Sequence, residues 1–289
     1  MQGMPQEDTH ENEELCLPLP RLAESSFSSP TVTISALTDE TLHERTGTRI
    51  AFTNRLGGTS PAPYRALNLS SNVGDIAAAV DTNRQMLLEA TGAELMIDSL
   101  IVPKQVHGSD VLVFDDVVST RAAAEAGADG IVCTQQDIPV LLCFADCTPV
   151  ISVAPNGAFS VVHAGWRGAY AGIPGIGLKT LCEQAKCNPS DCNTYIGPHI
   201  GACCYEVGED LLAKFVDRFG PECAEEDSHL NLSAAVIVSL LRAGAVPERI
   251  IDSGVCTSCN VDRYYSYRAE GGTTGRHGAL AFREEITWE

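Results

Sequence analysis

The sequence predicts an α+β fold, a single domain in which mixed β-sheets are covered by helices. Short segments rich in Val, Ile and Phe cluster between residues 99 and 164, and this composition is typical of buried strands. Strands and helices intermix without the regular βαβ alternation of a parallel sheet. The 289-residue chain also has no G-x-G-x-x-G or P-loop motif and no break in composition that would mark a second domain.

The chain is expected to begin with a tail. Residues 1–30 are acidic, rich in Ser and Pro and without periodicity, so we predict that they are mostly disordered and that residues 31–289 form the domain. The alternation in 31–37 predicts the first strand. Further strands are expected at 49–54, 99–108, 110–116, 129–134, 138–145, 149–154, 159–164, 194–200, 248–254 and 278–283.

A long loop and several helices complete the expected elements. Residues 55–75 are rich in Gly, Pro, Asn and Ser, and long loops of this composition inside a compact domain are usually functional or disordered. Asp75 and Gly92 are suitable cap residues for a helix over 75–92. Further helices are expected at 175–187, 208–220 and 230–244.

Charge and hydropathy exclude several function classes. The chain has 19 Lys and Arg against 38 Asp and Glu, a net charge of −19, which disfavours nucleic acids and anionic membrane surfaces as partners. No run of 18 apolar residues occurs, so no membrane span is expected. A small anionic substrate remains compatible with this charge if a few cationic residues gather in a cleft. The sequence does not indicate an oligomeric state.

Cysteine is abundant, with 12 residues. No signal peptide is visible, so we expect reduced thiols and a cytoplasmic location rather than a disulfide scaffold. Cys256 and Cys259 have the C-x-x-C spacing, but a single such pair is weak evidence for a zinc site. We expect the adjacent pair Cys203 and Cys204 to serve in packing.

Three segments place chemically active residues at the ends of predicted strands. His107 precedes a glycine, Asp146 and Cys147 follow an apolar strand, and His163 ends another. Taken singly, a strand histidine is usually a core residue and a buried cysteine is usually an inert small hydrophobe. Together, two imidazoles and one thiolate can bind Zn²⁺ tetrahedrally and leave the fourth position open.

Several motifs in one order resemble a known family. The segments KQVHGSDV, ADGIV, ADCTPV, HAGWRG, IGPHIG, CYEVG and YYSYRAEGGTTGRHGAL are similar to those of the YfiH-like, laccase-domain family. The resemblance runs from about residue 49 to residue 283. Members were long labelled multicopper polyphenol oxidases and are now understood as zinc-dependent purine nucleoside phosphorylases, with adenosine deaminase and methylthioadenosine phosphorylase activities.

The resemblance implies roles for particular residues. The family's metal ligands fall on His107, Cys147 and His163, so the implied cofactor is zinc, with copper as the alternative. Asp146 is the neighbouring acid, either as a proton donor to the departing purine or as a turn residue that accepts backbone hydrogen bonds. Arg167 is the expected phosphate contact because guanidinium groups match phosphate oxygens. Weaker candidates for substrate contact are Arg55 and Asn68. His199 and Arg276 are weaker candidates still, and a solvated surface role is the default expectation for each.

The implied function is phosphorolysis of adenosine, inosine, guanosine or methylthioadenosine to the base and ribose-1-phosphate, with adenosine deamination as a further activity. Three alternatives stay open. The first is a copper polyphenol oxidase, although seven histidines without an H-x-H pair are few for a multicopper set. The second is a metal-free hydrolase with Cys147 as nucleophile. The third is the peptidoglycan editing role named for some bacterial members.

Overall fold

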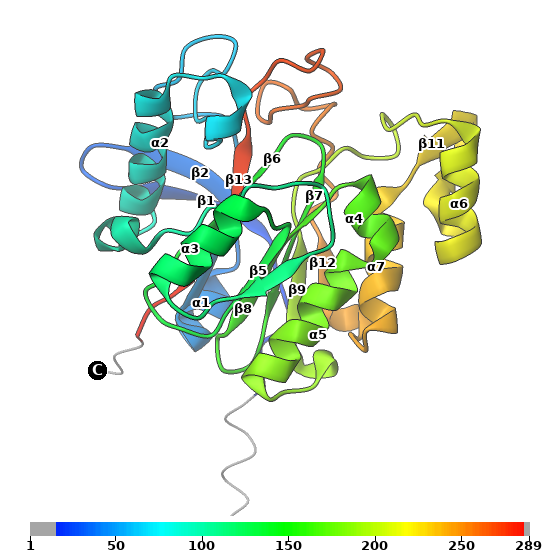
Figure 1. The fold of residues 1–289 in the computed structure, drawn as a ribbon, viewed down its shortest axis with the longest axis horizontal. Helices are drawn as coiled ribbons and strands as arrows, with labels where there is room; N and C mark the ends of the chain where they lie inside the picture. Colours follow the sequence, from blue (N-terminus) through cyan, green and yellow to red (C-terminus); the bar gives the residue numbers. More distant parts are fainter. Residues whose placement is uncertain (1–15, 286–289) are drawn as a thin grey trace, which may run out of the picture.

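Two β-sheets form the centre of the protein, and a computed structural model describes residues 16–285 of it (Figure 1). The first sheet is antiparallel throughout. Its five strands lie in the order β1 (Ala23–Ser28), β2 (Thr33–Thr38), β3 (Thr48–Thr53), β13 (His277–Arg283) and β6 (Val140–Phe144).

The second sheet is mixed. Its two outer pairs, β12 with β9 and β4 with β5, are parallel, and the other pairs are antiparallel. The six strands lie in the order β12 (Ile250–Asp252), β9 (Asn193–Ile196), β7 (Thr148–Val153), β8 (Phe159–Ala164), β5 (Gly130–Cys133) and β4 (Val111–Val113). A separate small pair is formed by β10 (Ala224–Glu225) and β11 (His229–Leu230).

Helices cover the outer faces of the two sheets. In Figure 1, α5 and α7 lie beside each other over the six-stranded sheet, and α2 lies on the other side of the molecule. The helices are α1 (Glu40–Thr46), α2 (Ala77–Ala90), α3 (Val117–Ala126), α4 (Trp166–Ala171), α5 (Ile173–Ala185), α6 (Glu209–Phe219) and α7 (Leu232–Arg242).

The alternation of side chains along the strands builds three apolar cores. On β13, Ala279 and Ala281 join the core between the two sheets, whereas Leu280 and Phe282 join the core under α2. Successive strand residues point to opposite faces, so a strand that is buried on both faces is apolar throughout. This explains the continuous apolar runs in the sequence and confirms the α+β class with sheets covered by helices.

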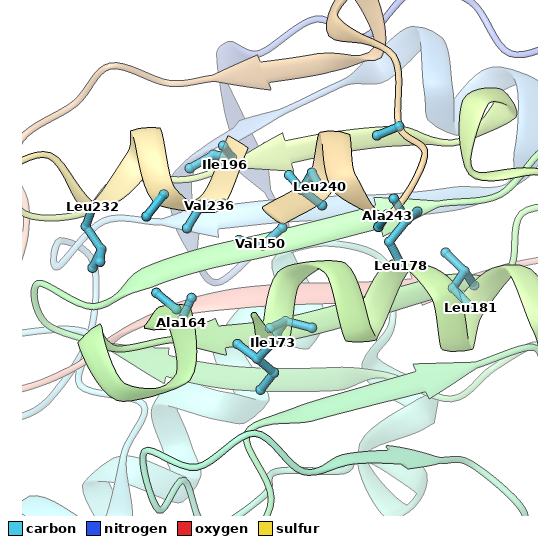
Figure 2. Close-up of a cluster of buried hydrophobic side chains, with 14 of the residues drawn as sticks. Val150, Ala164, Ile173, Leu178, Leu181, Ile196, Leu232, Val236, Leu240 and Ala243 are labelled. Carbon is cyan, nitrogen blue, oxygen red and sulfur yellow. The ribbon is translucent and has the colours of Figure 1, made fainter. Parts of the chain in front are cut away.

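The third core lies between the six-stranded sheet and its helices (Figure 2). Val150 of the sheet, Leu178 of α5 and Val236 and Leu240 of α7 are all buried there. Close approach is possible because Gly177 of α5 has no side chain. A Cβ at this position would lie 2.6 Å from Val162 of β8.

The start of the chain differs from the sequence prediction. Residues 16–30 are not a disordered tail, because β1 pairs with β2 along its whole length and Leu17 and Phe27 are buried. The sequence pattern did not predict this strand, because its outward positions are polar and rich in serine. Residues 1–15 of the expected tail lie outside the described residues.

Some element boundaries were also wrong. The helix predicted from residue 75 begins at Ala77, and Asp75 accepts hydrogen bonds from the Ile76 amide and the Asn68 side chain instead of capping it. The segment 99–108 is not a strand; only Ile101 forms a bridge, to Val140. None of the helices in the described part of the chain has the length and apolar character that crossing a membrane requires.

Candidate functional site

The predicted metal ligands lie where the chain crosses from one sheet to the other. Strand β6 of the five-stranded sheet ends at Phe144, and strand β7 of the six-stranded sheet begins at Thr148. Asp146 and Cys147 therefore sit in the crossing. Asp146 has a left-handed backbone with φ of 85°, which a non-glycine residue adopts rarely and mostly where the surroundings enforce it.

Strand register brings His163 to Cys147. In the β7–β8 pair, Thr148 lies opposite Ala164 and Pro149 lies opposite His163. The ring of His163 packs at 5.3 Å from the ring of Phe144 and is almost completely buried. The apolar strands thus provide rigid walls for a thiol and an imidazole that lie side by side.

His107 reaches the same point from a loop that Asp129 holds. The Asp129 carboxylate accepts hydrogen bonds from the backbone amides of Val106, His107 and Gly108, at 3.2, 2.9 and 2.7 Å. His107 has a left-handed backbone with φ of 59°. Its ring lies edge-on to the ring of His163, with 4.8 Å between the centroids.

Asp129 also orients His163. The Asp129 carboxylate lies 2.8 Å from Nδ1 of His163, and the His163 backbone amide donates to the Asp129 carbonyl at 2.7 Å. Burial raises the pKa of Asp129, but the hydrogen bonds from His163 and Gly108 outweigh burial and lower it. An ionised carboxylate at Nδ1 leaves Nε2 of His163 available as a ligand atom, as in many metal sites.

The three candidate ligands form one compact group. The ligand atoms of His107, Cys147 and His163 all lie within 4.8 Å of one another. Gly165 leaves the space that this group needs, since a Cβ there would lie 3.0 Å from the His107 ring and 3.2 Å from Sγ of Cys147. A nitrogen–nitrogen–sulfur set of this kind suits zinc and copper better than magnesium or calcium.

The electrostatics of the group favour a thiolate. Burial raises the pKa of the Cys147 thiol, but the charge of His163 and hydrogen bonds from both imidazoles lower it to about 6. Burial lowers the pKa of His163, but Cys147 and Asp129 raise it to about 9. Without a metal, the two side chains would therefore be a thiolate and an imidazolium at neutral pH.

The three ligands open onto a large cavity of about 840 Å³. A cavity of this size accommodates a nucleoside-sized ligand. Its wall carries four cationic side chains although the protein is strongly acidic. These are Arg84 of α2, Lys104 beside the His107 loop, and Arg268 and Arg276 from the segment before β13.

Asp146 lines the cavity, but both of its carboxylate oxygens are engaged. The Thr257 hydroxyl donates to Oδ1 at 2.7 Å, and the Arg268 amide donates to Oδ2 at 2.7 Å. This arrangement matches the turn-residue alternative rather than a proton donor, because both carboxylate oxygens already accept hydrogen bonds from the protein. Asp146 thereby connects the crossing at Cys147 to the segment that carries Arg268.

The structure does not bring Arg167 to the cavity wall. Arg167 lies in the first turn of α4, is exposed, and stacks over the Trp166 ring at 4.1 Å. The cationic side chains of the wall come instead from α2 and from loops. The expectation that Arg167 contacts the phosphate therefore lacks support from its position.

Arg55 and Asn68 lie behind the residues that line the cavity and are not part of its wall. Arg55 donates to Glu270 at 2.9 Å and to the Val261 carbonyl at 2.7 Å. Asn68 is fully buried, accepts from the Arg276 amide at 2.9 Å and donates to Asp75. Both residues hold loops in place and do not line the cavity.

Two further expectations were wrong. Arg276, expected at the solvated surface, lines the cavity with its guanidinium held by the carbonyls of Thr274 and Gly275. His199 is buried, and its Nδ1 lies 2.9 Å from the Gly197 carbonyl.

Asp129 was not predicted from the sequence, although an acidic residue directly before an apolar strand could have indicated it. Sequence alone carried no signal for Arg84 and Lys104.

Comparisons with known proteins show which sequences and folds this chain resembles. A family model described as multi-copper polyphenol oxidoreductase laccase matches residues 49–284. Purine nucleoside phosphorylase YlmD of Geobacillus stearothermophilus is 34% identical over 252 residues, which are 83% of this chain and 91% of that protein. A protein named adenosine deaminase RL5, from an unknown prokaryotic organism, is 30% identical and covers 74% of this chain and 85% of its own length.

Solved structures show the same fold. The crystal structure of YlmD from Geobacillus stearothermophilus superposes with a TM-score of 0.79 at 31% identity, covering 91% of this chain and all of that one. The YfiH structure from Bacillus licheniformis gives a TM-score of 0.77 at 25% identity, covering 89% of this chain and 98% of that one. By the extent of the family match and the identity to these relatives, the chain belongs to the YfiH-like, laccase-domain family.

Proposed function

We propose that the protein is a zinc-dependent purine nucleoside phosphorylase. The observation that carries the proposal is the His107, Cys147 and His163 group, which opens onto a cavity with four cationic side chains. The names of several relatives support the reaction, since they are purine nucleoside phosphorylases. Adenosine, inosine, guanosine and methylthioadenosine are the proposed substrates.

The donor set fits zinc. Two imidazoles and one thiolate are the ligands of catalytic zinc sites that keep a position open, and Asp129 supplies the carboxylate behind one histidine. The clearance at Gly165 fits a ligand group that closes around an ion. When bound, the metal would supply Lewis-acid stabilisation of negative charge on an oxygen of the reactants.

Phosphorolysis transfers a ribosyl group from purine to phosphate. The bond from C1′ to N9 breaks, a phosphate oxygen forms the new bond to C1′, and the purine leaves with the electron pair and takes up a proton. We assign phosphate binding to Arg84, Lys104 and Arg276, which line the cavity, because guanidinium and ammonium groups pair with phosphate oxygens. Holding phosphate beside the nucleoside makes the attack effectively unimolecular.

The cavity also offers a hydrogen-bond donor for the departing purine. Tyr205 lines the cavity, and burial raises the pKa of its phenol to about 12, so the hydroxyl keeps its proton at neutral pH. Asp146, with both oxygens engaged, acts in this proposal as a positioning residue for Arg268. Adenosine deamination is the second proposed activity, favoured by the similarity to the protein named adenosine deaminase RL5.

Multicopper chemistry fits the donor set less well. A laccase needs a trinuclear cluster with many histidine ligands besides a His₂Cys site. Within residues 16–285, the group at His107 and His163 is the only candidate metal group that contains histidine. Copper remains a competitor for this one group because such ligands bind Cu²⁺ tightly.

The deciding experiment is adenosine turnover by metal-analysed protein with and without phosphate. We expect adenine and ribose-1-phosphate only when phosphate is present, and loss of both products on chelation. Inosine as the sole product would make deamination the main activity. Full turnover by Cys147→Ala would contradict the metal proposal, and phenol oxidation by copper-loaded protein without nucleoside turnover would favour the older family label.

Phosphate binding by the cavity cations makes a separate prediction. Lys104→Ala and Arg84→Ala should each raise KM for phosphate about 10- to 100-fold, the loss expected for one charged hydrogen bond. KM for the nucleoside should change much less. Lys214→Ala, on the exposed face of α6, is the matched control. Equal effects of all three variants on phosphate KM would overturn the assignment of the phosphate site.

A further inference from the structure

A second group of metal-binding side chains lies beside the cavity. Cys203, Cys204, Cys256 and Cys259 place their four sulfur atoms within 4.8 Å of one another. Sγ of Cys259 lies 3.5 Å from Sγ of Cys203 and 3.4 Å from Sγ of Cys204. All four cysteines are free.

Sheet topology explains why two distant pairs of cysteines meet. Strands β9 and β12 are parallel neighbours, so the segments that follow them leave the same end of the sheet. Cys203 and Cys204 follow β9, and Cys256 and Cys259 follow β12. A bridge between His199 and Cys256 continues the pairing beyond the strands.

We propose that these four cysteines form a tetrathiolate site for a single zinc ion that ties the two segments together. Four sulfurs at 2.3 Å from a tetrahedral zinc would lie about 3.8 Å apart, which agrees with the separations here. In an iron–sulfur cluster, the sulfur atoms of cysteines that bind different irons lie farther apart than this. The sulfur–sulfur distances here therefore suit a single ion. Four clustered thiolates repel one another unless a cation compensates their charge.

The backbone around the sulfurs fits a metal site. The Gly201 amide donates to Sγ of Cys256 at 3.2 Å, and the Cys259 amide donates to the same sulfur. Such bonds orient and stabilise a ligating thiolate. Gly201 also leaves room, since a Cβ there would lie 3.3 Å from Sγ of Cys203 and 3.6 Å from Sγ of Cys256.

On both segments, a cysteine of the proposed site directly precedes a residue that lines the cavity or holds its wall. Cys204 precedes Tyr205, which lines the cavity, and Cys256 precedes Thr257, whose hydroxyl donates to Asp146. The first segment also contacts the chain that follows the second one, because the guanidinium of Arg268 donates to the Glu206 carbonyl. A bound ion would therefore fix the wall that carries Tyr205 and Arg268 while taking no part in the reaction.

Zinc counting by native mass spectrometry and elemental analysis tests the proposal on the reduced full chain. We expect about two zinc ions per chain, one at each cysteine-containing site next to the cavity. His107→Ala/His163→Ala should retain one ion, and Cys256→Ser/Cys259→Ser should lose one. The exposed thiol of Cys16 provides a matched control, because Cys16→Ser should keep both.

Cobalt substitution keeps the test decisive if the cysteine variant does not fold. In the His107→Ala/His163→Ala background, Co²⁺ should give the intense visible and thiolate charge-transfer bands of tetrahedral sulfur coordination. No metal in that background would overturn the proposal, as would iron in place of zinc. If Cys256→Ser/Cys259→Ser kept both zinc ions and Cys187→Ser lost one, the second ion would lie at the group of Cys182, Cys187 and Cys192, and the proposal would also be overturned.

Hydrogen exchange gives a readout that is independent of activity. Removal of the ion should speed amide exchange in residues 197–206 and 253–262, because the bridge between them is lost. Exchange in β7 and β8 should stay unchanged, since those strands are paired on both sides. Unchanged exchange in both segments on zinc removal would show that no ion holds them. His107, Cys147 and His163 are intact in Cys256→Ser/Cys259→Ser. A failure of the four-cysteine proposal is therefore distinguishable from a failure of the proposed catalytic site.

Discussion

At the scale of single residues, Asp129 organises the candidate catalytic site. Its fully buried carboxylate is hydrogen-bonded to the His163 imidazole and accepts hydrogen bonds from three backbone amides of the loop that carries His107. One side chain therefore fixes two of the three ligands. A buried charge is tolerated at this position because every partner is a hydrogen-bond donor.

We predict that Asp129→Asn weakens metal binding about 10- to 100-fold, as is typical when a carboxylate behind a ligating histidine is removed. The amide can accept from some of the four donors but carries no charge, and it adds a donor of its own. Zinc affinity measured by chelator competition checks this. The exposed Asp115→Asn should bind zinc like the wild type, and equal affinity of both variants would refute the role of Asp129.

A second residue-scale prediction concerns the space at Gly165. Gly165→Ala would place a methyl group 3.0 Å from the His107 ring and 3.2 Å from Sγ of Cys147. We expect this variant to fold but to purify with little zinc at this group, measured by elemental analysis beside the wild type. Gly208→Ala, where a Cβ meets nothing within 4 Å, is the control. Zinc bound to Gly165→Ala as in the wild type would contradict the inferred ligand geometry.

At the scale of elements, the strands buried on both faces position the site. The β7–β8 pairing sets Cys147 beside His163, and the pairing of β5 with β8 sets Asp129 beside His163. A register shift by one residue would turn His163 to the other face of the sheet. The helices α5 and α7 protect this register by covering the sheet.

The core under α7 provides a matched test of that packing. Leu240 is fully buried against the sheet (Figure 2), whereas the neighbouring Leu241 is 37% exposed. Leu240→Ala should lower the free energy of unfolding by about 2–5 kcal/mol, because it leaves a cavity. Leu241→Ala should cost much less. Urea denaturation of both variants decides, and equal losses would contradict the packing described here.

At the scale of the whole molecule, residues 16–30 are part of the fold. Besides the β1–β2 pairing, the Leu17 carbonyl accepts from Arg249 at 3.2 Å and the Pro18 carbonyl accepts from Asn193 at 2.8 Å. These contacts attach the early segment to the edge of the six-stranded sheet. The segment therefore contacts both sheets.

Deletion of residues 1–30 should consequently destabilise the protein. Loss of the buried Leu17 and Phe27 side chains alone removes about 1.5–3 kcal/mol each, and the deletion exposes the edge of β2 to aggregation. Urea denaturation and light scattering measure the two effects. Leu19→Ala, at a side chain that is 57% exposed, should change neither, and an unchanged unfolding midpoint after the deletion would show that the segment contributes nothing.

The sequence by itself determined most of the fold class and the three candidate metal ligands. Strands buried on both faces leave continuous apolar runs, and polar residues at the ends of such runs are conspicuous, as at Cys147 and His163. The motif order also indicated the family, which the comparisons confirmed. The sequence pattern predicted β1 less well, because its polar outward-facing residues give it the composition of a disordered segment.

Only the tertiary structure decided what surrounds those ligands. The cationic wall combines Arg84, Lys104 and Arg276 from segments far apart in the sequence, whereas Arg167, next to a ligand motif, is exposed and stacks over Trp166. The four cysteines meet because β9 and β12 are parallel neighbours, a pairing that spacing does not reveal. The physical reason is the same in each case: strand register and loop paths set distances between residues, whereas sequence patterns report only the burial and period of a single element.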